Sequence, residues 1–172
     1  VLSPALLTVS GDILLKNGDL DGAEAMYKRL VERYSESSFS DSGPVGMGLV
    51  ALARKKPQDA LKIFDEALQN NPGMSRFKEA TVGKLQALVD LEKYEDATKL
   101  ALQTVGDKMF RGQSAGEAYM LLAKAYRKQA AKANGRRFTW SQTRSLEELE
   151  KLRERYATPT GEPEDGCAIC HL

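Results

Sequence analysis

Hydrophobic residues along most of this chain recur at the three-to-four-residue spacing of amphipathic helices. Glycine, proline, asparagine and aspartate separate the periodic segments, as in Asn17-Gly18-Asp19 and Asn70-Asn71-Pro72-Gly73. The pattern predicts helices near residues 5–16, 20–34, 43–55, 57–70, 75–91, 94–106, 114–133 and 140–156. The sequence therefore predicts an all-α fold of helices joined by short turns.

A repeat of 37 residues runs through much of the chain. Ala23, Ala60 and Ala97 stand 37 residues apart. The positions twelve before and four after each alanine also correspond; they are Gly11, Gly48 and Leu85, and Tyr27, Phe64 and Ala101. Small residues let the two helices of a unit approach closely, and large rings then fill the space toward the next unit. Because a single unit cannot bury its apolar face alone, we expect stacked antiparallel helix pairs.

This arrangement resembles the tetratricopeptide repeat, and the second unit shows it most fully with Gly48, Ala60, Phe64, Ala67 and Pro72. The resemblance covers residues 5–133 well and residues 134–156 weakly. The long period and the segment Glu32-Arg-Tyr-Ser-Glu-Ser-Ser-Phe39 are similar to periplasmic tetratricopeptide proteins, such as those serving the Tol-Pal system and outer-membrane assembly. The resemblance implies a domain over residues 1–156, an α-solenoid of about three and a half to four helix pairs.

Tetratricopeptide proteins bind partners along the concave face formed by the first helix of each pair. Carried onto this chain, the resemblance implies a partner-binding face that includes Thr8, Asp12, Leu49, Leu52, Gln86, Asp90, Tyr119 and Tyr126. The Lys/Asn clamp with which some relatives bind a terminal carboxylate is missing from this chain. We expect protein partners or further copies of the chain, as a homo-oligomer or a filament, because the end of a repeat stack exposes apolar surface.

Composition and charge argue against several function classes. Lys and Arg number 25 and Asp and Glu number 24, so a net charge of +1 provides no strong field for nucleic acid. No segment approaches the roughly 18 apolar residues of a membrane span. We identify no catalytic set and no phosphate-binding glycine loop, so an enzyme is not expected. The start at Val1 fits a processed protein, and we expect a periplasmic or extracellular location.

The end of the chain has a different composition and carries a specific motif. A Pro/Gly-containing linker begins after Tyr156 and leads to Cys167-Ala168-Ile169-Cys170-His171, so that residues 157–172 form a separate tail. The C-x-x-C-H spacing is typical of covalent haem c attachment. Two thiols three residues apart can form thioethers with the two vinyl groups of one porphyrin, and the following imidazole is an axial iron ligand. The motif contains both cysteines and the one histidine of the chain, so we predict one haem c.

Other interpretations of the motif stay open. Cys167, Cys170 and His171 supply three of the four ligands of a tetrahedral zinc site, with the fourth from an acid or another chain. The cysteines also suit a structural or redox disulfide, although the thioredoxin-like βαβ context is absent. For haem, the sixth iron ligand is unknown, and Met109 and Met120 are the candidates to check first.

Two functional hypotheses follow from the repeat and the motif together. The first is an exported monohaem c-type cytochrome on a tetratricopeptide scaffold, which transfers electrons through protein–protein contacts or self-assembly. The alternative is a periplasmic adaptor protein whose C-x-x-C-H motif is a metal or disulfide site. A visible absorption spectrum separates the two hypotheses, because only the cytochrome hypothesis predicts a coloured protein.

Overall fold

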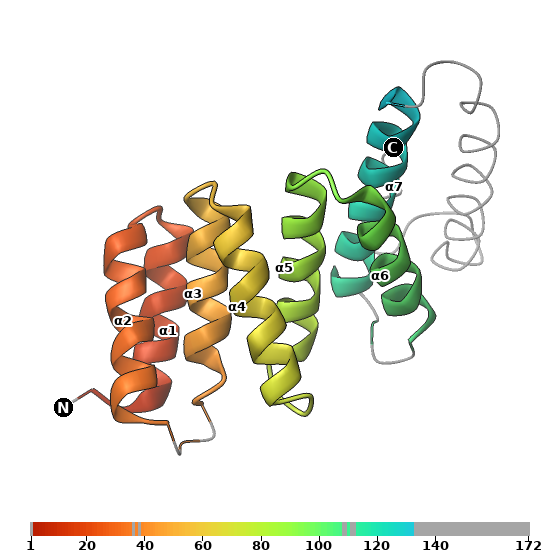
Figure 1. The fold of residues 1–172 in the computed structure, drawn as a ribbon. Coiled ribbons are helices and arrows are strands. Elements are labelled where there is room, and N and C mark those ends of the chain that lie inside the picture. The colour runs from red at the N-terminus through yellow and green to blue at the C-terminus, as the bar shows by residue number, and fades with distance from the viewer. Residues whose placement is uncertain (1, 36, 38, 108–109, 111–112, 133–172) are drawn as a thin grey trace, which may run out of the picture. The chain divides into compact units, whose positions relative to one another are not determined.

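The computed structural model describes residues 2–132, except residues 36, 38, 108–109 and 111–112. Its helices are α1 (Pro4–Lys16), α2 (Leu20–Arg33), α3 (Ser42–Ala53), α4 (Pro57–Asn70), α5 (Phe77–Asp90), α6 (Tyr94–Gly106) and α7 (Gln113–Lys132) (Figure 1). No strand occurs in this part of the chain. The predicted all-α, tetratricopeptide-like fold is confirmed, with each of these seven helices within two residues of its expected bounds. The helix expected over 140–156 and the tail 157–172 lie outside the described residues.

The chain divides into two compact units, residues 1–87 and residues 88–172, with the boundary inside α5. In the first unit, α1 and α2 form one antiparallel pair, α3 and α4 form the next, and α2 also packs against α3 (Figure 1). The side chain of Lys84 on α5 forms a 2.6 Å ion pair with Asp65 on α4. The first unit is therefore a stack of helix pairs, as the repeat predicts.

Local sequence explains where the first helices begin. The hydroxyl of Ser3 accepts a hydrogen bond from the backbone N–H of Leu6 at 3.3 Å, which satisfies a free donor at the start of α1. The carboxylate of Asp19 does the same for the N–H of Gly22 at the start of α2, at 2.9 Å. Pro57 is the first residue of α4, a position where its missing N–H costs little.

Each of the first two repeats is centred on a ring held between two glycines. Tyr27 is completely buried, and an ideal Cβ built on Gly11 would lie 2.7 Å from its ring, while one on Gly46 would overlap it. One repeat later, Phe64 is equally buried and occupies the same position between Gly48 and Gly83. The equivalent alanines, Ala23, Ala60 and Ala97, are also completely buried. The predicted alternation of small residues and rings is therefore the packing rule of this fold.

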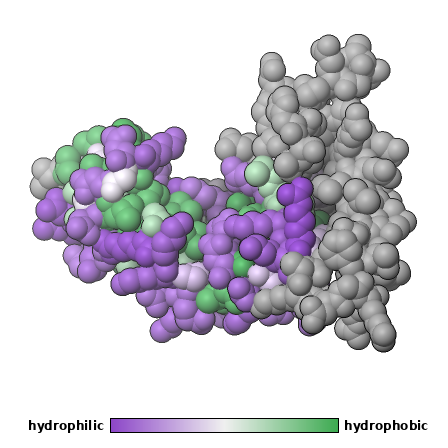
Figure 2. All heavy atoms as spheres, turned by 90° about the horizontal axis from the view of Figure 1, so that it is seen from above, coloured by the Kyte–Doolittle hydropathy of each residue, from purple (hydrophilic) through white to green (hydrophobic). Residues whose placement is uncertain are grey.

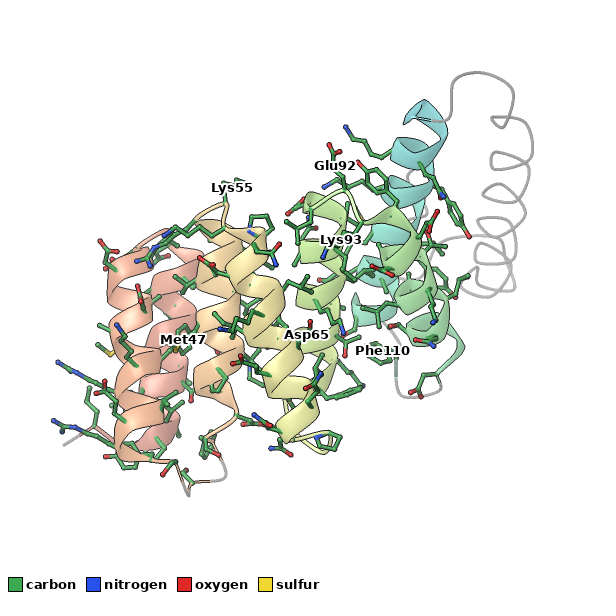
Figure 3. The ribbon with its side chains drawn as sticks, viewed as in Figure 1. Met47, Lys55, Asp65, Glu92, Lys93 and Phe110 are labelled. Atoms are coloured by element: carbon green, nitrogen blue, oxygen red, sulfur yellow. The ribbon has the colours of Figure 1, made fainter. Side chains whose placement is uncertain are left out.

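The turn inside each helix pair also repeats every 37 residues. The backbone N–H groups of Asp19, Lys56 and Lys93 bond to the carbonyls of Leu14, Ala51 and Leu88, which closes the preceding helix in the same way each time. One residue before each of these donors, φ is positive, at 82° for Gly18 and 60° for Lys55 and Glu92. Figure 3 shows Lys55 and Glu92 at the tips of their turns. Only the first repeat has the glycine that this conformation favours.

The second unit is built around α6 and α7, which pack against each other, and the last turn of α5. Its core includes Leu88, Tyr94, Phe110, Ala118, Tyr119, Leu122 and Tyr126, all less than 9% exposed. Asp90 and Lys124 form an ion pair at 3.6 Å near the surface. This unit has a packed core of its own.

Candidate functional site

The first helices of the first unit surround an open hollow, which we name the α1/α3 hollow. It has a volume of about 430 Å³ and is lined by Thr8, Asp12, Leu15, Lys16, Phe39, Ser42, Leu49, Ser75, Arg76 and Glu79. These residues come from α1, α3, the start of α5 and the connections that precede α3 and α5. Helices α2 and α4 contribute none of them. The hollow therefore lies on the side of the stack that is formed by the first helix of each pair.

Asp12 is held in the hollow by a buried tyrosine from the second helix. The Tyr27 hydroxyl donates to Asp12 Oδ1 at 2.6 Å, after its ring passes between Gly11 and Gly46. Burial raises the pKa of Tyr27 well above its ordinary value, and the hydrogen bond to Asp12 raises it further. The hydroxyl therefore stays protonated and remains a donor. One repeat later the two positions are occupied by Phe64 and Leu49, so this polar pair is special to the first repeat.

Arg76 joins the first and third helix pairs in the hollow. Its Nη2 donates to Asp12 Oδ1 at 3.1 Å and its Nε to Glu79 Oε2 at 2.5 Å, while the side chain is only 14% exposed. Burial lowers the pKa of Arg76, but its bond to Glu79 and the charges of Glu79 and Asp12 outweigh burial and raise it. The remaining terminal nitrogen, Nη1, is buried and has no hydrogen-bond partner among the described residues. The site therefore holds a fixed cation with donor capacity left over.

The lining of the hollow combines charged side chains with apolar ones. Asp12 and Glu79 offset the charge of Arg76, and Lys16 adds an exposed cation at the edge. Leu15, Leu49 and the 40% exposed ring of Phe39 supply apolar surface beside these polar groups. Such a mixture of apolar walls and few oriented polar groups suits a bound ligand or peptide. The part of the chain that the structure describes contains no histidine, and within it no cluster of metal-ligating side chains occurs.

The structure brings only some of the predicted partner-binding residues together. Thr8, Asp12 and Leu49 line the same hollow. Leu52 and Gln86 are half-buried on α3 and α5 of the first unit, outside the lining. Asp90 belongs to the second unit and pairs with Lys124.

Two of the predicted partner-binding residues need correction. Tyr119 and Tyr126 are 1% and 7% exposed, so they pack in the core of the second unit and do not line an open face. Helix periodicity places these two rings on one face of α7, but it does not say that the face is covered.

The sequence interpretation missed seven of the ten residues that line the hollow, among them Arg76, Glu79 and Phe39. Arg76 and Glu79 lie at the start of the third pair, and Phe39 lies in the connection before the second. One signal was present in the sequence: Asp12 and Tyr27 are polar where the next repeat has Leu49 and Phe64. A polar pair at packed positions requires further hydrogen-bond partners, and Arg76 is one of them.

Most of the predicted haem residues fall outside the part of the chain that the structure describes. Cys167, Cys170 and His171 lie beyond the described residues, as does Met109. Met120 lies on α7 and is 41% exposed. The donor set itself, two thiols at the required spacing followed by an imidazole, fits haem c.

Comparison with known families agrees with the geometry of the helix pairs. Residues 8–75 match the tetratricopeptide repeat family. The match runs from α1 to the connection that precedes α5, and it includes Thr8, Asp12 and Leu49 of the hollow. No curated protein and no solved structure matches the chain. The matched segment is therefore tetratricopeptide-like, and tetratricopeptide repeats mediate protein–protein interactions and are typically non-enzymatic scaffolds.

None of the helices within the described residues is long and apolar enough to cross a membrane.

Proposed function

We propose that this protein is a scaffold that binds an extended segment of a partner protein in the α1/α3 hollow. The observation that carries the proposal is the convergence of residues from three successive helix pairs on one mixed hollow. The tetratricopeptide match over residues 8–75 supports the same conclusion, because it spans most of this surface. The function is binding, and the chain need not change its partner chemically.

The polar groups suit the backbone of a bound peptide. Arg76 is held by Asp12 and Glu79, so little side-chain entropy is lost when it donates to a peptide carbonyl. Asp12 lines the same space, and its second carboxylate oxygen can accept a peptide N–H group. Phe39 and Leu49 provide contact for one apolar side chain of the peptide. We therefore expect partners that combine an extended backbone with a large apolar residue.

Selection from a peptide library tests this proposal. The full chain is immobilised, and displayed peptides are enriched on it. Truncating the exposed ring in Phe39→Ala is expected to weaken the enriched peptides roughly tenfold, the usual cost of losing an aromatic contact at an interface. The matched control is Lys62→Ala, because Lys62 is 76% exposed on α4 and lies outside the hollow. Equal affinities for the wild type and Phe39→Ala would contradict the proposal.

A second candidate function rests on the C-terminal motif. We propose that Cys167 and Cys170 hold one haem c and that His171 is its axial ligand, which makes the scaffold an electron-transfer protein. The supporting observation is that both cysteines and the one histidine of the chain fall in this motif. Bound haem would supply a one-electron redox centre. The chain's own residues would anchor the porphyrin by thioethers and set one axial ligand.

A visible spectrum tests the haem proposal. Protein from a host able to mature c-type cytochromes is expected to show a Soret band, with sharp α and β bands after reduction by dithionite. The colour should survive acid-acetone extraction, because thioether bonds are covalent, and should be lost in the double variant Cys167→Ala with Cys170→Ala. A colourless wild-type protein would favour the adaptor alternative, and metal and thiol analysis would then separate a zinc site from a disulfide.

Location and self-association remain parts of the proposed function. We expect an exported, periplasmic or extracellular protein on the basis of the periplasmic family resemblance.

Leu6, Val9 and Ile13 are each about half exposed on α1 and form an apolar stripe there, which supports association of copies. Hydrophobic groups also reach the surface between hydrophilic ones in the view from above (Figure 2). Cell fractionation tests the location, and the mass in solution tests self-association.

A further inference from the structure

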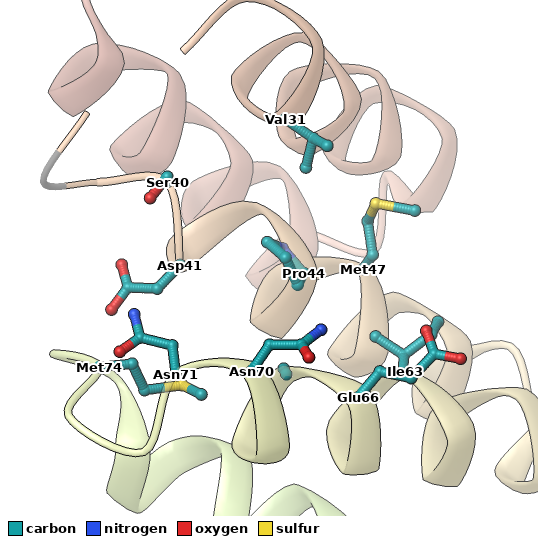
Figure 4. Close-up of a pocket in the computed structure, with 11 residues that line it drawn as sticks. Val31, Ser40, Asp41, Pro44, Met47, Ile63, Glu66, Asn70, Asn71 and Met74 are labelled. Atoms are coloured by element: carbon teal, nitrogen blue, oxygen red, sulfur yellow. The ribbon is translucent and has the colours of Figure 1, made fainter. Parts of the chain in front are cut away.

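The first unit has a second concave surface on the side formed by the second helices. It has a volume of about 390 Å³, and Figure 4 shows its lining. Its apolar lining residues are Val31, Pro44, Met47, Ile63, Ala67 and Met74. We name this surface the α2/α4 pocket, because α2 and α4, which contribute nothing to the α1/α3 hollow, line it together with α3 and the connections before α3 and α5.

Asp41 supplies an incompletely satisfied carboxylate to the lining of this pocket. It is the N-cap residue of α3, yet its side chain does not cap that helix. Its Oδ2 instead accepts hydrogen bonds from the backbone N–H and the hydroxyl of Ser75, at 2.6 and 2.9 Å. Its Oδ1 is buried and has no hydrogen-bond partner among the described residues. A buried carboxylate oxygen without a donor is costly, so the site favours a ligand that brings one.

Three further features of the α2/α4 pocket favour a positively charged ligand. Glu66 lies in the lining, and its ion pair with Lys62, at 3.9 Å, is mostly exposed and therefore weak. Helix α4 ends at Asn70 in the lining and has no basic residue in its last turn, so the negative end of its dipole is not offset there. Among the residues that the structure describes, no lysine, arginine or histidine lines the pocket.

We propose that the α2/α4 pocket binds a short peptide segment in which large apolar residues flank an arginine or lysine. The apolar residues would rest on the floor, where the flexible side chains of Met47 and Met74 can adapt to their shape. The cationic group would donate to Asp41 Oδ1 and lie near Glu66 and the end of α4. Charge complementarity selects a basic segment over an acidic one. This proposal goes beyond partner binding in the α1/α3 hollow, and the two linings share no residue, although Asp41 is hydrogen-bonded to Ser75 of the hollow.

Methionine methyl signals in the NMR spectrum test the proposal directly. The full chain is labelled with ¹³C at the methionine methyl groups and titrated with acetyl-Leu-Arg-Leu-amide. We expect the signals of Met47 and Met74 to shift together, while that of Met120 on α7 stays in place. The peptide acetyl-Leu-Glu-Leu-amide is expected to cause no shift, because its carboxylate would face Asp41 and Glu66.

Asp41→Asn is expected to weaken the arginine peptide roughly tenfold, as for the loss of one charge-assisted hydrogen bond. The control Asp59→Asn removes an exposed charge from α4 outside the pocket and should bind as the wild type. If Asp41→Asn fails to fold, Glu66→Gln replaces it, with an expected weakening of about twofold for an exposed charge. Phe39→Ala should bind normally, which separates this site from the hollow.

Three outcomes would overturn the proposal. The first is that neither methionine signal responds to the arginine peptide. The second is that the glutamate peptide produces the same shifts. The third is equal affinity of Asp41→Asn and Asp59→Asn, or of Glu66→Gln and the wild type if the first variant does not fold.

Discussion

At the scale of single residues, the hydroxyl of Tyr27 decides the character of the α1/α3 hollow. Phe64 occupies the equivalent space one repeat later, so packing alone requires only a ring. The added hydroxyl reaches Asp12 at 2.6 Å, and Asp12 in turn receives Arg76. The hydroxyl oxygen of Tyr27, which Phe64 lacks, therefore helps to hold the side chains of Asp12 and Arg76 in place.

The raised pKa of Tyr27 predicts a specific loss of stability in alkali. The unfolded tyrosine ionises near its ordinary pKa of about 10, whereas the folded one holds its proton to higher pH. The unfolded state therefore releases its proton first, so the contribution of Tyr27 is complete below about pH 10 and declines as the pH rises further. Urea denaturation of the wild type and Tyr27→Phe, at pH values on both sides of 10, measures this contribution.

Tyr27→Phe is expected to be less stable than the wild type by about 1–3 kcal/mol near neutral pH, because a hydrogen bond to a charged group is lost. The difference should shrink above pH 10. All other side chains are the same in both proteins, so their contributions largely cancel in the difference. A difference that stays constant across this range would show that the Tyr27 proton is not held more tightly in the folded state.

At the scale of elements, the 37-residue step places the same turn after α1, α3 and α5, but only the first turn has glycine at the left-handed position. A residue with a Cβ costs about 1–2 kcal/mol in that conformation, and part of this is offset by the greater freedom of unfolded glycine. We predict that Lys55→Gly stabilises the first unit by about 0.5–1 kcal/mol. Chemical denaturation measures the gain, and Gly18→Lys, the reverse change, should destabilise by a similar amount.

The glycines beside Tyr27 and Phe64 determine how closely neighbouring helices pack against these rings. A Cβ on Gly46 would overlap the Tyr27 ring, so Gly46→Ala is expected to destabilise the protein by about 1–3 kcal/mol through overpacking. Gly116 on α7 has nothing within 4 Å of its ideal Cβ. Gly116→Ala should therefore stabilise by about 0.5–1 kcal/mol through helix propensity. Thermal unfolding of both variants is the measurement, and a destabilised Gly116→Ala with an unaffected Gly46→Ala would contradict the packing account.

The repeat explains why the helices could be predicted from the sequence. Turn residues such as Asn17-Gly18-Asp19 and the recurring alanines mark the helix ends and the close approach of each pair within a few neighbouring positions. Gly46 and Gly83 also stand 37 residues apart, but their role became evident only when the rings were located. Local sequence signals were therefore sufficient to predict the seven described helices.

The site was less predictable, because its contacts are distant in sequence. Asp12 is hydrogen-bonded to Tyr27, 15 residues away in the sequence, and to Arg76, 64 residues away. Local periodicity predicts neither contact. The buried positions of Tyr119 and Tyr126 show the same limit, since a helical period does not tell which face another helix will cover. A polar or charged residue at a position that the repeat normally packs indicates such a site better than helical periodicity does.

At the scale of the whole molecule, a tetratricopeptide-like repeat and a C-terminal motif with its own chemistry occur in one chain. The repeat over residues 8–75 contains most of the proposed binding surface, and the C-x-x-C-H motif at residues 167–171 supplies the proposed haem attachment. The two proposals are independent, because the hollow needs no haem and the motif needs no peptide. A coloured protein that binds no peptide, or a colourless one that does, would separate them.

An amide chemical-shift map of the full chain with a library-selected peptide tests whether the α1/α3 hollow binds the partner. We predict that the largest shifts fall on Thr8, Asp12, Ser42, Leu49 and Arg76, which are distant in sequence but line one hollow. The helices of the first unit should otherwise change little, because the site is preformed. Shifts confined to other surfaces, with these five amides unchanged at saturation, would contradict the claim that the α1/α3 hollow binds the partner.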